Sequence, residues 1–152
     1  SLHLAGNTTT GDALNLKKIE DQIKGFPIYL YPDISLKELT KLYGESLIYW
    51  HAAGFRETDP KKMEHFGIST VEAMASGCIP IVINLGGQKE IVEDGKSGFL
   101  WNSIDEWKKQ TIKVLTDKKI QTTISKNAIK RSTLYSKERF CNQIEKIVYA
   151  NH

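Results

Sequence analysis

The sequence predicts an α/β fold, with a Rossmann-like, three-layer α/β/α arrangement around a mostly parallel sheet. Short apolar runs alternate with amphipathic segments of helical length, and this alternation is typical of βαβ units. The run from Ile79 to Ile83 consists mainly of Ile and Val, as expected for a parallel strand that helices cover on both faces. The length of 152 residues corresponds to a single domain spanning 1–152.

Up to residue 50 the chain alternates strand and helix, with clear start and stop signals. Gly25 follows an amphipathic segment and is well placed to end a helix. Pro32 follows an apolar run and ends a strand there. Ser35 and Glu38 have the spacing of a capping box, which indicates a helix start. The predicted strands are 2–6, 27–31 and 47–50, and the predicted helices are 14–24 and 35–44.

After residue 50 the same alternation continues and then gives way to helices. A long polar loop, 52–63, precedes a helical segment that Gly77 is placed to end. Asp94–Gly95 closes a short helical turn before the last strand. The predicted strands are 79–83 and 99–101, and the predicted helices are 68–75, 89–93, 103–115, 120–134 and 137–149; the last two lie in a block of C-terminal helices, 116–152.

Composition and charge exclude several classes of protein. The 21 basic and 18 acidic residues are mixed along the chain and give a net charge of +3, so there is no basic stripe for nucleic acid. Cys78 and Cys141 share no metal or disulfide spacing, and we predict two reduced, packed thiols in a cytosolic protein. No apolar run reaches the ~18 residues needed to cross a membrane. The start at Ser1, just before an apolar run, indicates a piece excised from a longer protein.

Most candidate binding residues lie between Glu64 and Glu72. These carboxylates are eight positions apart, or ~12 Å if the segment were wholly helical, which is too far to share one proton or one metal ion. A predicted helix N-terminus lies between them and would attract an anion, and Gly67 lets a ligand approach the backbone. Two hydroxyl-binding carboxylates around an anion site match the order of groups in a nucleotide sugar.

Structural interpretations of the same residues remain open. Ser69 and Glu72 also have capping-box spacing, so Glu72 could simply bond the Ser69 N–H. Glu64 could be a solvated loop carboxylate. Gly86–Gly87 follows a buried strand and either exposes backbone N–H groups beside the site or forms a plain strand-to-helix turn.

The histidines and tryptophans give weaker signals. His51 ends the third predicted strand and is either a packed residue or one that faces a ligand. His65 is interpreted as structural. A metal site made of His51, Glu64 and His65 is disfavoured, because the H-E-x-x-H pattern is absent. The tryptophans are predicted to pack in the core: Trp50, Trp101 and Trp107.

Three motifs in combination resemble a known enzyme family. Residues 64–82 read E-H-F-G-I-S-T-V-E-A-M-A-S-G-C-I-P-I-V, residues 86–92 read G-G-Q-K-E-I-V, and residues 94–100 read D-G-K-S-G-F-L. This pattern resembles the retaining glycosyltransferases of family 4, or glycosyltransferase group 1, over about residues 2–115. The resemblance implies a GT-B architecture, of which this chain would be most of the C-terminal, donor-binding domain.

The resemblance also implies roles for individual residues. Glu72 would bind the ribose hydroxyls, and Glu64, the candidate catalytic residue, would contact hydroxyls of the donor sugar. The nucleobase would lie near Tyr31. Backbone groups would contact the sugar and diphosphate at Phe66, Gly67 and Ile68, and the site would be bordered by Gly86 and Gly87.

The implied reaction moves a sugar from a UDP-, GDP- or ADP-sugar to an acceptor hydroxyl with retention. The acceptor would be a glycan or a lipid-linked saccharide, as in polysaccharide biosynthesis, and no metal or other cofactor is expected. A sugar-nucleotide epimerase, and a nucleotide-binding or assembly module without activity, are the alternatives. A dehydrogenase is disfavoured because no G-x-G-x-x-G follows the first strand.

Two units of the family are expected to be missing from this chain. These are the acceptor-binding N-terminal domain, and an opening strand with a Gly-Arg segment and a Lys that hold the diphosphate. The chain alone is therefore expected to be catalytically inactive. An unpaired sheet edge left by the absent strand could lead to a homo-oligomer. The full-length protein is expected in the cytoplasm, where it could associate peripherally with the cytoplasmic face of the membrane.

Overall fold

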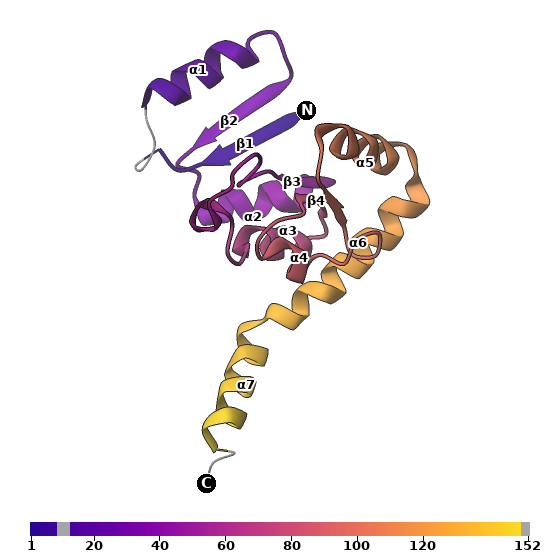
Figure 1. Cartoon of the computed structure of the whole chain (residues 1–152). Coiled ribbons are helices and arrows are strands. Elements are labelled where there is room, and N and C mark those ends of the chain that lie inside the picture. The colour runs from indigo at the N-terminus through magenta and orange to yellow at the C-terminus, as the bar shows by residue number, and fades with distance from the viewer. Residues whose placement is uncertain (9–12, 150–152) are drawn as a thin grey trace. The chain divides into compact units, whose positions relative to one another are not determined.

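The computed structural model describes residues 1–8 and 13–149. Contacts within the chain group it into two compact units, Ser1–Leu42 and Tyr43–His152. Each unit contains part of the predicted α/β pattern (Figure 1). The assignment of residues 1–152 to one domain stays a prediction.

The unit Ser1–Leu42 contains a two-stranded parallel sheet. Strand β1 (Leu2–Gly6) pairs with β2 (Ile28–Pro32) from Leu2 opposite Ile28 to Gly6 opposite Pro32. Helix α1 (Ala13–Ile23) connects them, and Gly25 follows it with a φ of 84°, which confirms the predicted helix stop. These strands and this helix agree with the predicted elements to within a residue or two.

Helix α2 (Leu36–Glu45) starts where the capping box predicts. The Ser35 N–H donates to Glu38 Oε2 at 3.2 Å, and the Glu38 N–H donates to Ser35 Oγ at 3.3 Å. Two otherwise unpaired donors of the first turn are thereby satisfied.

The unit Tyr43–His152 is built around a second parallel sheet. Its strands are β3 (Ile48–His51), β4 (Ile79–Ile83) and β5 (Phe99–Trp101), in the order β3-β4-β5. Every residue of β4 is buried, as its Ile and Val content predicts.

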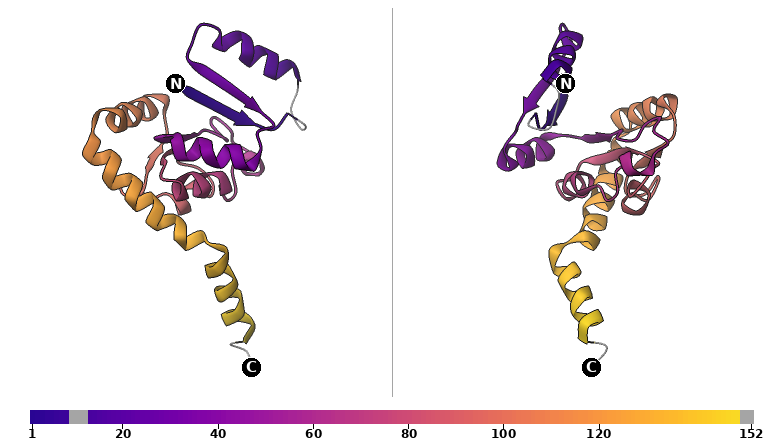
Figure 2. Two further views of the ribbon diagram at one scale, coloured as in Figure 1. Left: turned by 180° about the vertical axis from the view of Figure 1, so that it is seen from behind. Right: turned by 60° about the vertical axis from the view of Figure 1, so that its left-hand side comes forward.

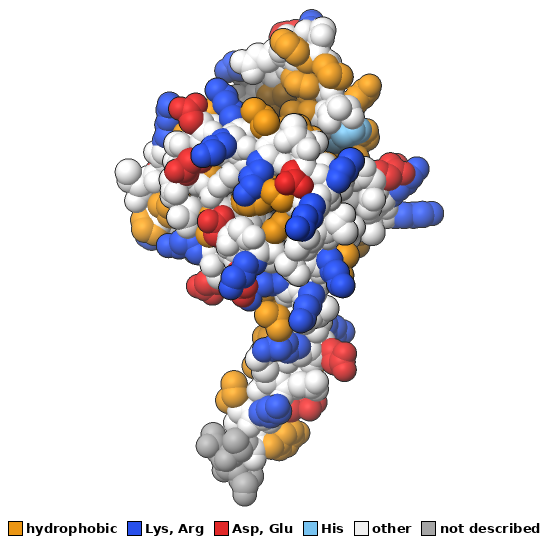
Figure 3. All heavy atoms as spheres, turned by 90° about the vertical axis from the view of Figure 1, so that its right-hand side faces the viewer, with side chains coloured by type: hydrophobic (Ala, Val, Ile, Leu, Met, Phe, Trp, Pro, Cys, Tyr) orange, Lys and Arg blue, Asp and Glu red, His pale blue; other side chains and the backbone are white. Residues whose placement is uncertain are grey.

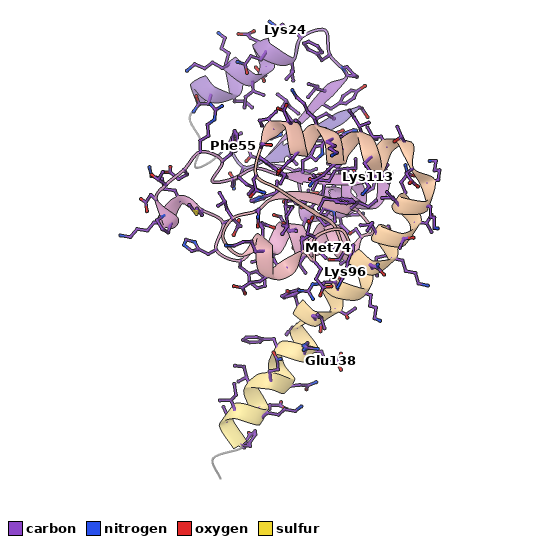
Figure 4. All side chains as sticks on the ribbon, turned by 45° about the vertical axis from the view of Figure 1, so that its right-hand side comes forward. Lys24, Phe55, Met74, Lys96, Lys113 and Glu138 are labelled. Carbon is purple, nitrogen blue, oxygen red and sulfur yellow. The ribbon has the colours of Figure 1, made fainter. Side chains whose placement is uncertain are left out.

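Helices cover both faces of this sheet, as the sequence predicts (Figure 1). On one face Ile81 and its neighbours pack with Val114 of α5 (Ile104–Thr116). On the other, Val82 packs with Met74 of α3 (Ile68–Ala75), which is labelled in Figure 4, and with Ile91 of α4 (Gln88–Ile91). Helix α6 (Lys118–Ser132) contributes Ile124 to the first cluster and Ala128 to the second. The three layers of the predicted fold class are therefore present here.

The strands form two parallel sheets where the sequence predicts one. The strand order is β1-β2 in the first sheet and β3-β4-β5 in the second. A sheet continues only through hydrogen-bonded neighbours, and β1 and β3 each pair with one strand only among the described residues. Each of these two strands therefore has one edge without a strand partner in the described part of the chain.

The C-terminal helices follow the predicted pattern with small shifts. Helix α6 begins before residue 120, because the Asp117 side chain accepts from the N–H groups of Lys119 and Ile120. A short 3-10 helix, Thr133–Tyr135, leads to α7 (Lys137–Tyr149). Another, Pro60–Lys62, lies in the predicted loop 52–63. No helix of the described residues is long and apolar enough to span a bilayer.

Helix α7 has no buried residue and extends away from the sheet of its unit (Figure 2). Hydrophobic side chains lie along it between basic ones (Figure 3); the exposed ones are Phe140, Ile144, Ile147, Val148 and Tyr149. Cys141 is exposed on this helix, so the prediction that it is packed is wrong. Cys78 is buried as predicted, and its Sγ donates to Tyr43 O at 3.1 Å.

The tryptophans pack inside this unit, as predicted. Trp50 and Trp107 meet edge to face with ring centroids 4.8 Å apart. Trp101 is 1% exposed and lies against Phe55 of the loop after β3, labelled in Figure 4.

The packing predicts a contrast between two matched substitutions. Ile81→Ala in β4 removes a side chain that is 0% exposed, whereas Ile112→Ala in α5 removes one that is 60% exposed. The first should lower the free energy of unfolding by about 2–5 kcal/mol, and the second should change it by less than about 0.5 kcal/mol. Urea unfolding followed by circular dichroism measures both. Equal effects would contradict the described core.

The two thiols should differ in reactivity. Burial raises the pKa of Cys78 to about 11, and only the thiolate is a good nucleophile. At about pH 8 an aromatic disulfide reagent should therefore modify Cys141 rapidly, and Cys78 only after unfolding. The Cys141→Ser variant should lose the rapid phase. Two rapidly reacting thiols in the folded protein would show that Cys78 is accessible.

Candidate functional site

The start of helix α3 has unpaired backbone donors. Its N-cap, Gly67, has a left-handed backbone with φ 97° and provides no side-chain cap. The N–H groups of Thr70 and Val71 donate to Gly67 O at 3.0 and 3.2 Å. Those of Ile68 and Ser69 donate to no acceptor among the described residues. Free N–H groups together with the positive end of a helix dipole form a site for an anion.

Glycine is required at position 67 for two reasons. Its φ is positive, and a Cβ there would lie 2.7 Å from Gln88 Nε2 and 3.1 Å from Ile91 Cδ1. Gln88 is fully buried, and its Oε1 accepts from Thr70 Oγ1 at 2.9 Å. This contact holds the first turn of α3 against α4.

Glu64 folds back onto the turn that precedes α3. Its Oε1 accepts from the N–H groups of Phe66 and Gly67 at 3.2 and 3.0 Å. Its Oε2 lies 4.0 Å from His51 Nε2 and accepts no hydrogen bond from a described residue. The side chain is 35% exposed. Glu64 is therefore held in place through Oε1, and Oε2 is available to accept a hydrogen bond from a ligand.

Glu72 does not form the capping box that its spacing allows. The N-cap of helix α3 is Gly67, so Ser69 lies inside the helix, and its Oγ shares a hydrogen bond of 2.8 Å with Tyr49 OH. The half-buried Glu72 carboxylate has no hydrogen-bond partner among the described residues. The capping interpretation is thus wrong, because Gly67 displaces the helix start.

Two tyrosines lie close to these carboxylates. Burial is the main cause that raises the pKa of Tyr49, and the negative fields of Glu64 and Glu72 add to it. Burial also raises the pKa of Tyr43, again with a contribution from Glu72. Both phenols are therefore neutral near pH 7 and can donate hydrogen bonds. The motifs do not indicate either tyrosine, because only tertiary packing brings β3 and the end of α2 to this helix.

Gly86 and Gly87 pack against the backbone that carries Glu64. The Gly87 N–H donates to Glu64 O at 3.0 Å. A Cβ on Gly86 would overlap Glu64 O, and one on Gly87 would lie 2.7 Å from Phe66 O. The glycine pair also forms the turn from β4 to α4. Because glycine has no side chain, the turn after β4 and the turn before α3 can contact each other.

The other predicted residues flank this turn. Phe66 and Ile68 are 49% and 65% exposed at the start of α3. The Phe66 and Tyr135 rings meet edge to face, with centroids 5.9 Å apart, and Tyr135 OH donates to Glu90 O at 2.7 Å. No local signal indicates Tyr135, which lies far along the chain. His65 is exposed.

The remaining candidates are Tyr31 and the possible metal ligands. Tyr31, expected near a nucleobase, belongs to the unit Ser1–Leu42, where its OH bonds His3 Nδ1 at 3.0 Å. Within residues 1–8 and 13–149, no group of three or more His, Cys, Asp or Glu side chains is placed to hold a metal ion.

Known proteins share this sequence pattern and fold. Residues 2–131 match the sequence model of the family described as glycosyl transferases group 1. A Dictyostelium discoideum protein, GDP-Man:Man(3)GlcNAc(2)-PP-Dol alpha-1,2-mannosyltransferase, is 33% identical over 138 residues. That alignment covers 88% of this chain but 25% of the relative, so the chain spans about a quarter of that protein's length.

Two solved structures have a similar fold. Anabaena HepE in complex with UDP-glucose matches with a TM-score of 0.77 and 22% identity, over 97% of this chain and 40% of that one. The C-terminal domain of a group 1 glycosyltransferase, LpcC, from Francisella tularensis matches with a TM-score of 0.66 and 24% identity. This match covers 82% of this chain and 64% of that one. The fold is therefore that of a GT-B C-terminal domain.

Because the turn after β4 lies close to the turn before α3, adding one methyl group at Gly87 should lower the stability of the protein. Gly87→Ala places a Cβ against the carbonyls of His65 and Phe66, and overpacking of this kind costs about 1–3 kcal/mol. Gly44→Ala near the end of α2 meets nothing within 4 Å and should be neutral or stabilising by up to about 1 kcal/mol. Urea unfolding gives both values, and amide chemical shifts of residues 64–67 should move only in Gly87→Ala. Wild-type stability and unchanged shifts in that variant would contradict the described turn.

Proposed function

The chain belongs to the glycosyl transferases of group 1, and on that basis we propose that it supplies the donor-binding half of a retaining hexosyltransferase. The observation that carries the proposal is the uncapped start of α3, with Glu64 before it and the unpaired Glu72 within it. A diphosphate between two hydroxyl-rich groups fits this order of an anion site and two carboxylates.

Each part of a nucleotide sugar then has a partner in this unit. The diphosphate accepts from the N–H groups of Ile68 and Ser69, which lack other partners among the described residues. The ribose hydroxyls donate to Glu72. Hydroxyls of the sugar donate to Glu64 Oε2, the oxygen that the turn leaves available. Backbone groups of Phe66 and Gly67 border the sugar.

The proposed chemistry depends on charge stabilisation by the backbone. As the bond between sugar and diphosphate breaks, negative charge develops on the departing diphosphate, next to the positive end of the α3 dipole. Donors already oriented toward that charge lower the barrier without rearrangement. We propose that no metal ion is required, and that the acceptor attacks on the face from which the diphosphate leaves, which gives retention.

The relatives suggest which donors to test first. The name of the Dictyostelium protein specifies GDP-mannose, and the HepE complex contains UDP-glucose. We propose a hexose donor of one of these two kinds, with a glycan or lipid-linked saccharide as acceptor. Because the chain spans about a quarter of the curated relative, we expect no transfer from these residues alone. Action at the cytoplasmic face of a membrane remains part of the proposal.

The proposal predicts saturable nucleotide binding that depends on Glu72. Isothermal titration of the purified chain with UDP, GDP, UDP-glucose and GDP-mannose should show binding of one nucleotide and its sugar conjugate. Glu72→Gln should weaken both by about tenfold or more, because the ribose hydroxyls would then meet a neutral amide with one acceptor oxygen in place of a charged carboxylate with two.

A matched control is Glu138→Gln on α7, which is labelled in Figure 4. This variant should bind like the wild type. Binding of none of the four compounds, or equal affinity in Glu72→Gln and wild type, would contradict the proposed donor site.

A further inference from the structure

His51 is a polar residue at the candidate site whose side chain is largely buried. It is the last residue of β3, so it lies at the carboxyl end of the strand, where ligands of parallel sheets bind. Its side chain is 9% exposed, and its Nδ1 is buried without a hydrogen-bond partner among the described residues. An unpaired buried polar atom costs about 1–3 kcal/mol, which an apolar residue at this position would avoid.

The other nitrogen of His51 faces the available oxygen of Glu64. The distance from Nε2 to Glu64 Oε2 is 4.0 Å, longer than a hydrogen bond. Burial lowers the pKa of His51, and Glu64 is the charged group that acts against this effect. A neutral imidazole with its proton on Nε2 can donate to Oε2 after a shift of about 1 Å.

We propose that His51 is a positioning residue that orients the Glu64 carboxylate toward the donor sugar. Glu64 Oε1 is held by the N–H groups of Phe66 and Gly67. Rotation of the carboxylate is therefore limited by what lies beside Oε2, and His51 Nε2 lies 4.0 Å from that oxygen. This inference rests on the proposed function, because it assigns Oε2 to the sugar hydroxyls.

The inference predicts different effects on the binding of a nucleotide sugar and on the binding of the nucleotide alone. His51→Leu should weaken binding of the nucleotide sugar on the order of tenfold, which is within the coupling range of contacting residues. Binding of the nucleoside diphosphate alone should not change. His51→Gln, whose amide can reach the position of Nε2, should keep most of the wild-type affinity for the nucleotide sugar. The probes are UDP-glucose against UDP and GDP-mannose against GDP.

A double-mutant cycle tests whether His51 acts through Glu64. In the Glu64→Gln background, His51→Leu should produce no further loss of sugar binding. Equal weakening of nucleotide and nucleotide sugar by His51→Leu, or additive losses in the double variant, would overturn the inference in favour of a purely structural role. Urea unfolding of each variant checks that the fold is retained.

A measurement without ligand separates this inference from the proposed function. In a proton NMR titration, the pKa of His51 should fall further in Glu64→Gln, because the carboxylate that favours the imidazolium is removed. An unchanged pKa would overturn the contact. Absence of any nucleotide binding would overturn the proposed function instead, while the titration would still decide whether His51 and Glu64 interact.

Discussion

The geometry of the candidate site depends on a backbone contact that excludes Cβ atoms. Gly86 and Gly87 lie against the carbonyls of residues 64–66, and Gly67 lies against Gln88. Because no side chain separates the two loops, the turn after β4 supports the turn before α3. The left-handed backbone at Gly67 then starts the helix without a side-chain cap. A larger residue in either loop would move the start of α3, and with it both glutamates.

This support leaves several polar groups without partners inside the protein. The N–H groups of Ile68 and Ser69, the Glu72 carboxylate and His51 Nδ1 have no hydrogen bond to a described residue. Such groups usually pair during folding, because desolvation without a partner is costly. The free N–H groups and the two carboxylates at the start of α3 are the physical reason for proposing ligand binding in this region.

Local signals predicted most elements of the fold. The capping box at Ser35 and the glycine stop at Gly25 involve groups within a few positions of each other, and both appear in the structure. The Ser69–Glu72 spacing is an equally valid local signal but was misleading, because the contact between Gly67 and Gln88 shifts the helix start. Cys141 is exposed because it lies on α7, a helix with no buried residue.

By itself the sequence determined the order of strands and helices, the family resemblance and the placement of two glutamates around Gly67. Periodicity, caps and motif spacing are local properties of the chain, so a sequence displays them directly. Tertiary structure decided that Glu72 stays unpaired, that one oxygen of Glu64 is anchored, and that the strands form two sheets. It also brought Tyr49, Tyr135 and His51 to the site. Pairing of a polar group depends on which distant residues pack around it, and no local pattern encodes that packing.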